Sequence, residues 1–231
     1  MKKDYTHISF LLDRSGSMNI IAKAMMDGYN EYIGKQKTIP GKATVSVSQF
    51  DDIYDVLYEM IDINDVPLLT DEVYIPRGWT ALNDATAKLI NRTGELLAAM
   101  PENERPEKVI FVVISDGSEN YSKEFANHNN GVARLKEITE RQEKVYNWEF
   151  VYIGANQNSH ANAAAYGMAN SLNYLANDAS VKGMFSKLSN SSTKMRTASV
   201  RGKSLSTTKM EIADNDTEED LTADYLSGKI K

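Results

Sequence analysis

The sequence predicts an α/β fold: a Rossmann-like, doubly wound and mostly parallel central sheet with one antiparallel edge strand and helices on both faces. Apolar runs alternate with segments of helical period along most of the chain, which is typical of parallel sheets built by right-handed crossovers. The runs around Leu11 and Val112 are apolar throughout, as in central strands covered on both faces. Only Asp51 and Asp52 separate the second run from the third, which indicates an antiparallel hairpin whose outer strand lies at the sheet edge.

Six segments carry strand patterns: 5–12, 43–50, 54–61, 109–114, 150–154 and a weaker pattern at 171–174. Apolar residues recur at helical spacing over 21–32, 82–100 and 132–145, and further helices are expected at 159–166 and from Ala179 onward. We expect the first helix to begin around Met18, and Asn83 and Asp84 to help cap the second. Beyond Ser189 the chain is rich in Ser and Thr, so we expect the last helix to give way to disorder.

Composition places the chain among soluble globular proteins, with 231 residues of which 42% are hydrophobic and 25% charged. There is no cysteine, which excludes disulfides, thiolate zinc sites and cysteine nucleophiles. The first apolar run is ended by Asp13 and Arg14, far too early for a membrane span or a signal peptide. We therefore expect no membrane association and a cytoplasmic location.

The formal charge of −6 is distributed unevenly. Residues 209–231 carry seven acids against three lysines, and the stretch before them, 179–210, is basic. The expected organisation is one domain over 1–203 and an acidic, flexible tail over 204–231. A basic helix followed by an acidic tail could indicate nucleic-acid binding or self-association, but a solvated helix face explains it better, and the acidic overall balance argues against nucleic acid.

Two polar loops follow the two most apolar strands. Asp13, Ser15 and Ser17 come directly after the first, and Asp116 follows the fourth. Parallel α/β sheets place their sites at the carboxyl ends of the strands, where the strand order reverses. These side chains offer only hard oxygen atoms and two formal charges, which favours Mg²⁺ or Mn²⁺ over Ca²⁺ and excludes a preference for soft metals.

A third loop precedes the second helix and places the hydroxyl of Thr80 after Gly78. Together the three segments resemble the metal-ion-dependent adhesion site of the von Willebrand factor A family: D-x-S-x-S, then Thr in a Gly-x-Thr turn, then Asp in a D-G turn. The resemblance covers roughly residues 5–188. It implies one divalent cation held by five residues, some through water: Asp13, Ser15, Ser17, Thr80 and Asp116. No position of the motif is substituted.

The resemblance also implies a function, namely binding a partner protein through an Asp or Glu that completes the metal shell. Arg14, Arg77 and Trp79 flank the expected ligands and are expected to form the rim that contacts the partner. The chain is most similar to stand-alone intracellular members of the family found in bacteria and their viruses. The sequence leaves the partner and the oligomeric state open.

Two other classes of function remain open. One is a regulatory or assembly factor that works with a separate ATPase, since the chain contains no Walker motif. The other is a magnesium-dependent phosphotransferase or phosphatase of the haloacid dehalogenase type, which needs a second Asp where this chain has Ser15. The three histidines lie in separate segments, and no nucleophile, base and leaving-group partner occur together. We therefore expect a binding module and no enzyme activity.

Overall fold

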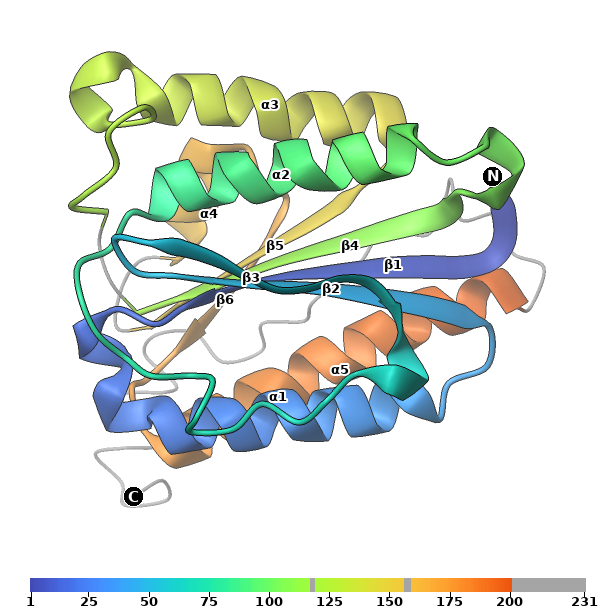
Figure 1. The fold of residues 1–231 in the computed structure, drawn as a ribbon, viewed down its shortest axis with the longest axis horizontal. Helices are drawn as coiled ribbons and strands as arrows, with labels where there is room; N and C mark the ends of the chain where they lie inside the picture. The colour runs from blue at the N-terminus through green and yellow to red at the C-terminus, as the bar shows by residue number, and fades with distance from the viewer. Residues whose placement is uncertain (117–118, 156–158, 201–231) are drawn as a thin grey trace.

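A six-stranded sheet forms the middle layer of the molecule (Figure 1). The computed structural model describes residues 1–116, 119–155 and 159–200. In the order β3-β2-β1-β4-β5-β6, only β3 is antiparallel to its neighbour. The predicted fold class and the predicted edge hairpin are therefore confirmed. The strands are β1 (Lys2–Asp13), β2 (Lys42–Phe50), β3 (Tyr54–Asp62), β4 (Pro106–Ser115), β5 (Glu149–Ala155) and β6 (Asn170–Tyr174).

Helices cover both faces of this sheet (Figure 1). α1 (Ala22–Lys37) and α5 (Asp178–Val200) pack on one face, and α2 (Leu82–Ala98), α3 (Gly131–Tyr146) and α4 (Ser159–Tyr166) on the other. Short 3-10 helices connect them: η1 (Gly16–Ile21), η2 (Ile63–Asp65), η3 (Glu102–Glu104) and η4 (Asn127–Asn129).

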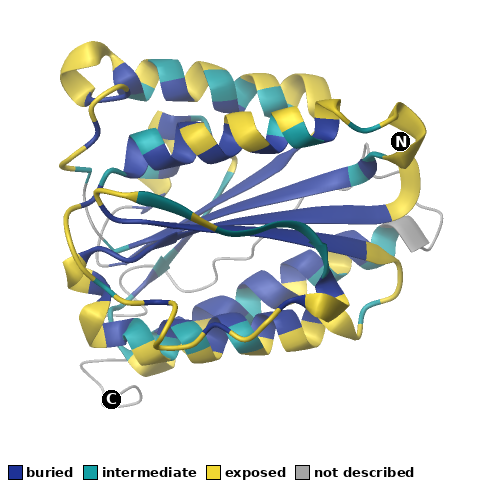
Figure 2. Ribbon diagram, viewed as in Figure 1, coloured by how far each residue is buried: buried dark blue, intermediate teal, exposed yellow. Residues whose placement is uncertain are grey.

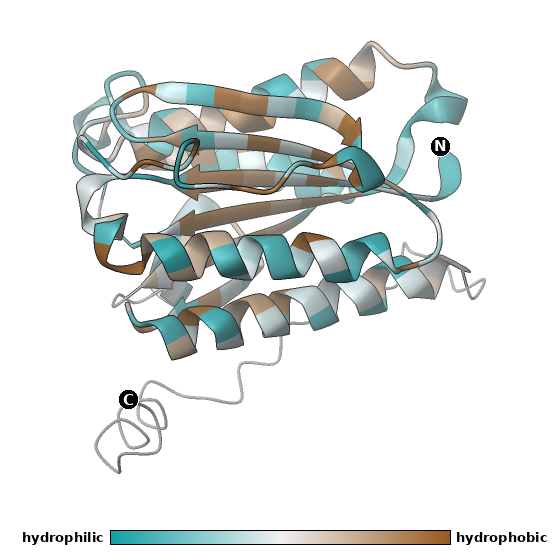
Figure 3. Cartoon of the chain, turned by 60° about the horizontal axis from the view of Figure 1, so that its bottom comes forward, coloured by the Kyte–Doolittle hydropathy of each residue, from teal (hydrophilic) through white to brown (hydrophobic). Residues whose placement is uncertain are grey.

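Each face of the sheet has its own apolar core. The central strands are buried along nearly their whole length, whereas the helices are exposed on their outer sides (Figure 2). The hydropathy pattern agrees, with apolar strands and helices of mixed character (Figure 3). The continuous apolar runs in the sequence therefore reflect burial from both sides.

The structure corrects two helix ends. The first α-helix does not begin at Met18, because residues 16–21 form the 3-10 helix η1 and α1 begins at Ala22. The last helix does not end at Ser189 but continues to Val200. Its Ser and Thr residues lie against α1 and find hydrogen-bond partners there, as between Tyr32 and Ser192. Tertiary contacts thus outweigh the low helix propensity of Ser and Thr.

The expected capping of α2 is also corrected. The residue before the helix is Ala81, and the first N–H groups of α2 are capped from the loop after β4: Asn83 donates to Glu119 and Asp84 to Ser122. Asp84 instead accepts hydrogen bonds from the backbone N–H groups of Lys123, Glu124 and Phe125. Its carboxylate therefore holds the loop that follows β4 against the start of α2.

The strand order reverses between β1 and β4, which lie side by side in the sheet and lead into loops at the same edge. This places the residues after Asp13 and after Ser115 next to each other, where α/β sheets hold their sites. The predicted tail, 204–231, lies outside the described residues. Among the described residues, no helix is both long enough and apolar enough to cross a membrane.

Candidate metal site

Asp13, the last residue of β1, is completely buried. One carboxylate oxygen, Oδ1, accepts a hydrogen bond from the backbone N–H of Ser15 at 2.7 Å. The other, Oδ2, accepts from the hydroxyl of Ser115 at 2.5 Å. Tyr74 donates to the backbone oxygen of Asp13, also at 2.5 Å. These contacts fix both the side chain and the backbone of Asp13.

A chain of side-chain hydrogen bonds joins the first loop to the loop after β4. The hydroxyl oxygens of Ser15 and Ser17 lie 3.2 Å apart, and Ser17 donates to Oδ1 of Asp116 at 2.8 Å. Ser15 is buried, whereas Ser17 is exposed. Four of the five predicted ligands thus lie together, although 99 residues separate Ser17 from Asp116.

Thr80, the fifth predicted ligand, is buried in a loop that contacts both of the other loops. The N–H of Gly16 donates to the backbone oxygen of Gly78 at 3.3 Å, which joins the Thr80 loop to the first loop. Thr80 donates its own N–H to the side chain of Asn120 at 2.9 Å, and its backbone oxygen accepts from Asn120 and Tyr121. The third loop is thereby held beside Thr80.

The turn between β2 and β3 holds the first loop and the Thr80 loop in place, a role that the sequence analysis did not predict. Asp51 is buried, and its Oδ2 contacts Nε of Arg14 at 3.1 Å and Nε of Arg77 at 2.8 Å. Its backbone oxygen accepts from the N–H of Ala81 at 3.0 Å. No local pattern indicates this role, because Asp51 has the place of an ordinary turn residue and its partners, Arg14 and Arg77, are distant along the chain.

Arg14, Arg77 and Trp79 were expected to contact the partner, and for Arg14 this expectation is wrong. Arg14 is only 4% exposed, and its guanidinium pairs with Asp51 and Asp55. It therefore supports the loops and is not available on the surface to a partner. Arg77 and Trp79 are exposed, with 54% of the Arg77 side chain and 62% of Trp79 accessible to solvent.

Gly78 adopts a backbone conformation that favours glycine, with φ of +68°. A Cβ atom at this position would lie 2.1 Å from Oδ1 of Asp52. The backbone conformation therefore favours glycine in the Gly-x-Thr turn, and a larger residue would also displace the exposed side chain of Asp52.

The two acids lie in an environment that disfavours their negative charge. Burial raises the pKa of Asp13 to about 7, hydrogen bonds from Ser115 and Ser15 act in the opposite direction, and Asp116 raises it further. Burial also raises the pKa of Asp116. Among the described residues, no Lys, Arg or His forms an ion pair with either carboxylate, since Arg14 is engaged with Asp51 and Asp55.

This donor set fits a small divalent cation. A cation beside the two carboxylates would offset the cost of burying them, and the accompanying donors are hydroxyl oxygens suited to hard ions. The hydroxyl of Tyr174 adds to the fit: it is buried without a hydrogen-bond partner among the described residues. Burial, and after it the charges of Asp116 and Asp13, raise its pKa well above the usual value.

A scan of protein-family models and a search of curated proteins both give no match. Solved structures do match. A von Willebrand factor type A protein from Catenulispora acidiphila gives a TM-score of 0.55 at 13% identity, over 83% of this chain and 43% of that one. The von Willebrand factor domain of the pilus tip protein Mfa5 from Porphyromonas gingivalis gives 0.55 at 8% identity, over 82% and 95%. The chain has the von Willebrand factor A fold.

A further structure with this fold is proximal thread matrix protein 1 from the mussel byssus, described with zinc in its metal-ion-dependent adhesion site. It matches with a TM-score of 0.54 and 15% identity, over 83% of this chain and 46% of that one. This chain thus spans less than half the length of the mussel and Catenulispora proteins. In the von Willebrand factor A fold seen here, the five motif residues lie at the carboxyl ends of β1 and β4 and in the loop before α2.

Proposed function

We propose that this chain is a metal-dependent protein-binding module. Asp13, Ser15, Ser17, Thr80 and Asp116 hold one divalent cation, and an Asp or Glu of a partner protein completes its coordination. The observation that carries the proposal is the unbroken series of contacts from Asp13 through Ser15 and Ser17 to Asp116. It supports a cation shared by the two loops, with exposed Ser17 on the side from which a partner approaches.

The proposed ion is Mg²⁺ or Mn²⁺. An oxygen-only donor set with two carboxylates favours a small, hard ion that keeps part of its water shell. The zinc in the mussel protein supports a divalent cation in a site of this kind, without favouring one ion.

The hydrogen-bond partners of the two serine hydroxyls favour a binding role over catalysis. The hydroxyls of Ser15 and Ser17 bond to each other, and that of Ser17 bonds to a carboxylate. Neither lies within hydrogen-bond distance of a histidine or lysine in the described part of the chain, and the carboxylate that accepts from Ser17 is itself a proposed metal ligand. We therefore favour a binding module, and we propose that the chain is not an enzyme and acts in the cytoplasm.

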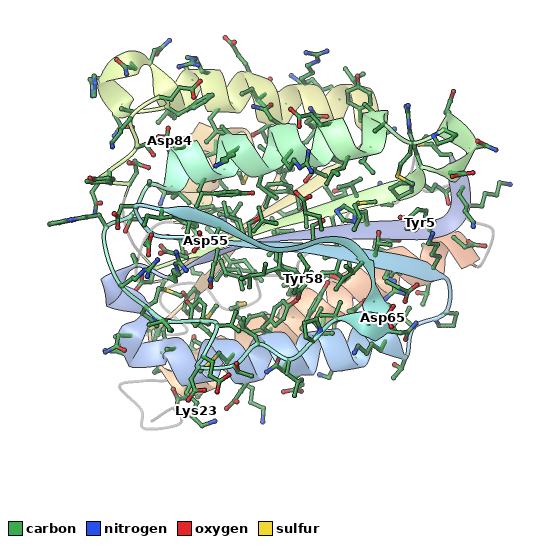
Figure 4. The ribbon with its side chains drawn as sticks, viewed as in Figure 1. Tyr5, Lys23, Asp55, Tyr58, Asp65 and Asp84 are labelled. Atoms are coloured by element: carbon green, nitrogen blue, oxygen red, sulfur yellow. The ribbon has the colours of Figure 1, made fainter. Side chains whose placement is uncertain are left out.

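Manganese titration of the full chain by calorimetry tests the metal site. We expect affinity between micromolar and millimolar for the wild type, and losses of more than about tenfold for Asp13→Asn and for Asp116→Asn. Asp65→Asn is the matched control, because Asp65 is an exposed acid at the opposite end of the sheet (Figure 4). Equal affinity in all four proteins would refute the ligand assignment.

Measurements of partner binding test whether a partner carboxylate completes the coordination of the metal. The partner's affinity is measured with magnesium, with EDTA, and after each partner acid near the contact is changed to its amide. A partner carboxylate on the metal predicts faster dissociation in EDTA and sensitivity to a single acid. Undiminished binding in EDTA would leave the metal a structural role only.

A further inference from the structure

A groove with a cavity volume of about 680 Å³ lies beside the metal site, between α2 and the β2–β3 hairpin. Ala81 and Tyr121 line it. Ala81 directly follows Thr80, and the N–H of Tyr121 donates to the backbone oxygen of Thr80. Asp84, labelled at the start of α2 in Figure 4, also lines it. A segment bound at the metal can therefore continue into this groove without leaving the surface.

The walls of the groove combine apolar surface with fixed charges. Ile53, Val56 and Tyr121 are exposed by 51%, 46% and 38%, and the buried rings of Phe50 and Phe125 lie beneath. Exposed apolar side chains in a concave surface are typical of places where another chain docks.

All of the carboxylates that line the groove already have partners. Asp51 pairs with Arg14 and Arg77, Glu59 and Glu95 pair with Arg92, and Glu124 pairs with Arg134. Asp52 and Asp84 accept hydrogen bonds from backbone N–H groups. Each of these acids thus has a counter-charge or an N–H donor beside it.

Two lysines of the lining differ from these acids. Lys88 Nζ lies 4.4 Å from the ring centroid of Tyr54, and Lys123 Nζ lies 5.3 Å from that of Tyr121. Neither ammonium group has a carboxylate partner among the described residues. Contact with an aromatic face holds a cation in place while its N–H donors remain available. The groove therefore presents two positioned cations for an incoming anion.

We propose that the groove binds the continuation of an acidic, extended segment of a partner protein. One carboxylate of this segment coordinates the metal, and a second one, further along, binds Lys88 and Lys123 with apolar side chains between them. The proposal rests on the proposed function and adds the chemistry of the partner. A polyanion such as nucleic acid is disfavoured, because Lys88 and Lys123 are the only cations of the lining without a carboxylate partner among the described residues, and they match one or two carboxylates of a ligand.

Selection from random peptides displayed on phage, against the full chain in magnesium, tests the proposal. We expect selected peptides to carry two acidic positions at a constant spacing. Selection against Lys88→Gln/Lys123→Gln should lose the preference at one of them, and selection in EDTA should lose the preference at the other. The two losses are separable, so failure of the metal site and failure of the groove are distinguishable.

Fluorescence anisotropy of the best peptide then gives magnitudes. We expect each lysine substitution to weaken binding about twofold to fivefold, and the pair about tenfold, in magnesium and in EDTA alike. The matched control is Lys42→Gln, because Lys42 also lies over a tyrosine ring, that of Tyr5, 4.4 Å away. Tyr5 is at the opposite end of the sheet (Figure 4).

Three results would overturn the proposal. They are the absence of any enriched peptide, a single acidic position in the selected peptides, and unchanged affinity in the double lysine variant. Tighter peptide binding after the acids of 209–231 are changed to amides would assign the groove to this chain's own acidic stretch in place of a partner.

Discussion

Burying a single polar side chain in the interior of this protein costs free energy, and this cost affects the protonation of the side chain. Asp13 and His7 both lie on β1 and are both completely buried. For Asp13, a bound metal ion can offset the cost of burying the carboxylate. For His7, Nδ1 shares a hydrogen bond with the hydroxyl of Thr44 at 3.0 Å, while Nε2 has no partner among the described residues. His7 is therefore held in the neutral form.

This predicts a pH dependence of stability. Burial lowers the pKa of His7 to about 4, whereas in the unfolded chain it is about 6.5. Above the unfolded value the group is neutral in both states and has no effect. As the pH falls below 6.5, only the unfolded chain takes up the proton on this histidine, so the contribution of His7 to the free energy of unfolding decreases, by about 2 kcal/mol at pH 5.

Urea unfolding at pH 7 and pH 5 measures this effect. The raised pKa of Asp13 acts in the opposite direction over this range, so the readout is the difference between proteins. From pH 7 to pH 5, His7→Leu should gain about 2 kcal/mol of stability relative to the wild type, whereas His128→Gln, changed at an exposed position, should follow the wild type. The same pH response in His7→Leu as in the wild type would show that His7 is not the group responsible.

At the scale of elements, the contact between α1 and α5 depends on small residues. Gly28 faces the ring of Phe185, and a Cβ at position 28 would lie 2.2 Å from its Cδ2. Further along, Gln36 donates to Ser189 and Thr193, and Arg196 donates to the backbone oxygen of Gln36. The serines that lower helix propensity in α5 are thus the ones that allow close approach to α1.

Two glycines of α1 should therefore respond in opposite ways to alanine. Gly28→Ala should destabilise the protein by about 1–3 kcal/mol, because the ring of Phe185 is buried and must move. Gly34→Ala should stabilise it by up to about 1 kcal/mol, because nothing lies within 4 Å of the added atom. Thermal unfolding of both variants decides the matter, and a stabilised Gly28→Ala protein would contradict the packing described here.

At the scale of the whole molecule, the metal should be linked to stability. A cation that binds only the folded state at one hundred times its dissociation constant adds about 2.7 kcal/mol, which corresponds to an increase of about 5–10 °C in Tm for a chain of this size. Asp13→Asn should abolish the increase. Differential scanning calorimetry with and without manganese measures it, and an equal increase in the variant would place the ion elsewhere.

The acidic tail, residues 204–231, should be dispensable for this fold. The described helix α5 ends at Val200, and among the described residues none beyond Met195 belongs to either apolar core. A chain ending at Lys203 should melt within about 2 °C of the full chain and bind manganese equally well. A truncated protein that is insoluble or melts far lower would show that Ile212, Leu221, Tyr225 and Leu226 pack on the domain.

The sequence by itself determined the layers of the fold and the position of the site. Apolar runs and helical periods are local patterns, and burial of a strand on both faces leaves a continuous signature, as around Val112. The motif residues were also visible, through the resemblance to the metal site of the von Willebrand factor A family and through the position of two of its loops after strand ends. Asp13, Ser15, Ser17 and Asp116 are close together as expected.

Only the tertiary structure decided what supports the site and what surrounds it. Arg14 lies inward because Asp51, which is buried, and Asp55 pair with it from the β2–β3 hairpin. The extension of α5 to Val200 depended on contacts with α1 that lie about 160 residues away in sequence. Such interactions join residues distant along the chain, and their energies depend on burial and geometry that no local pattern contains.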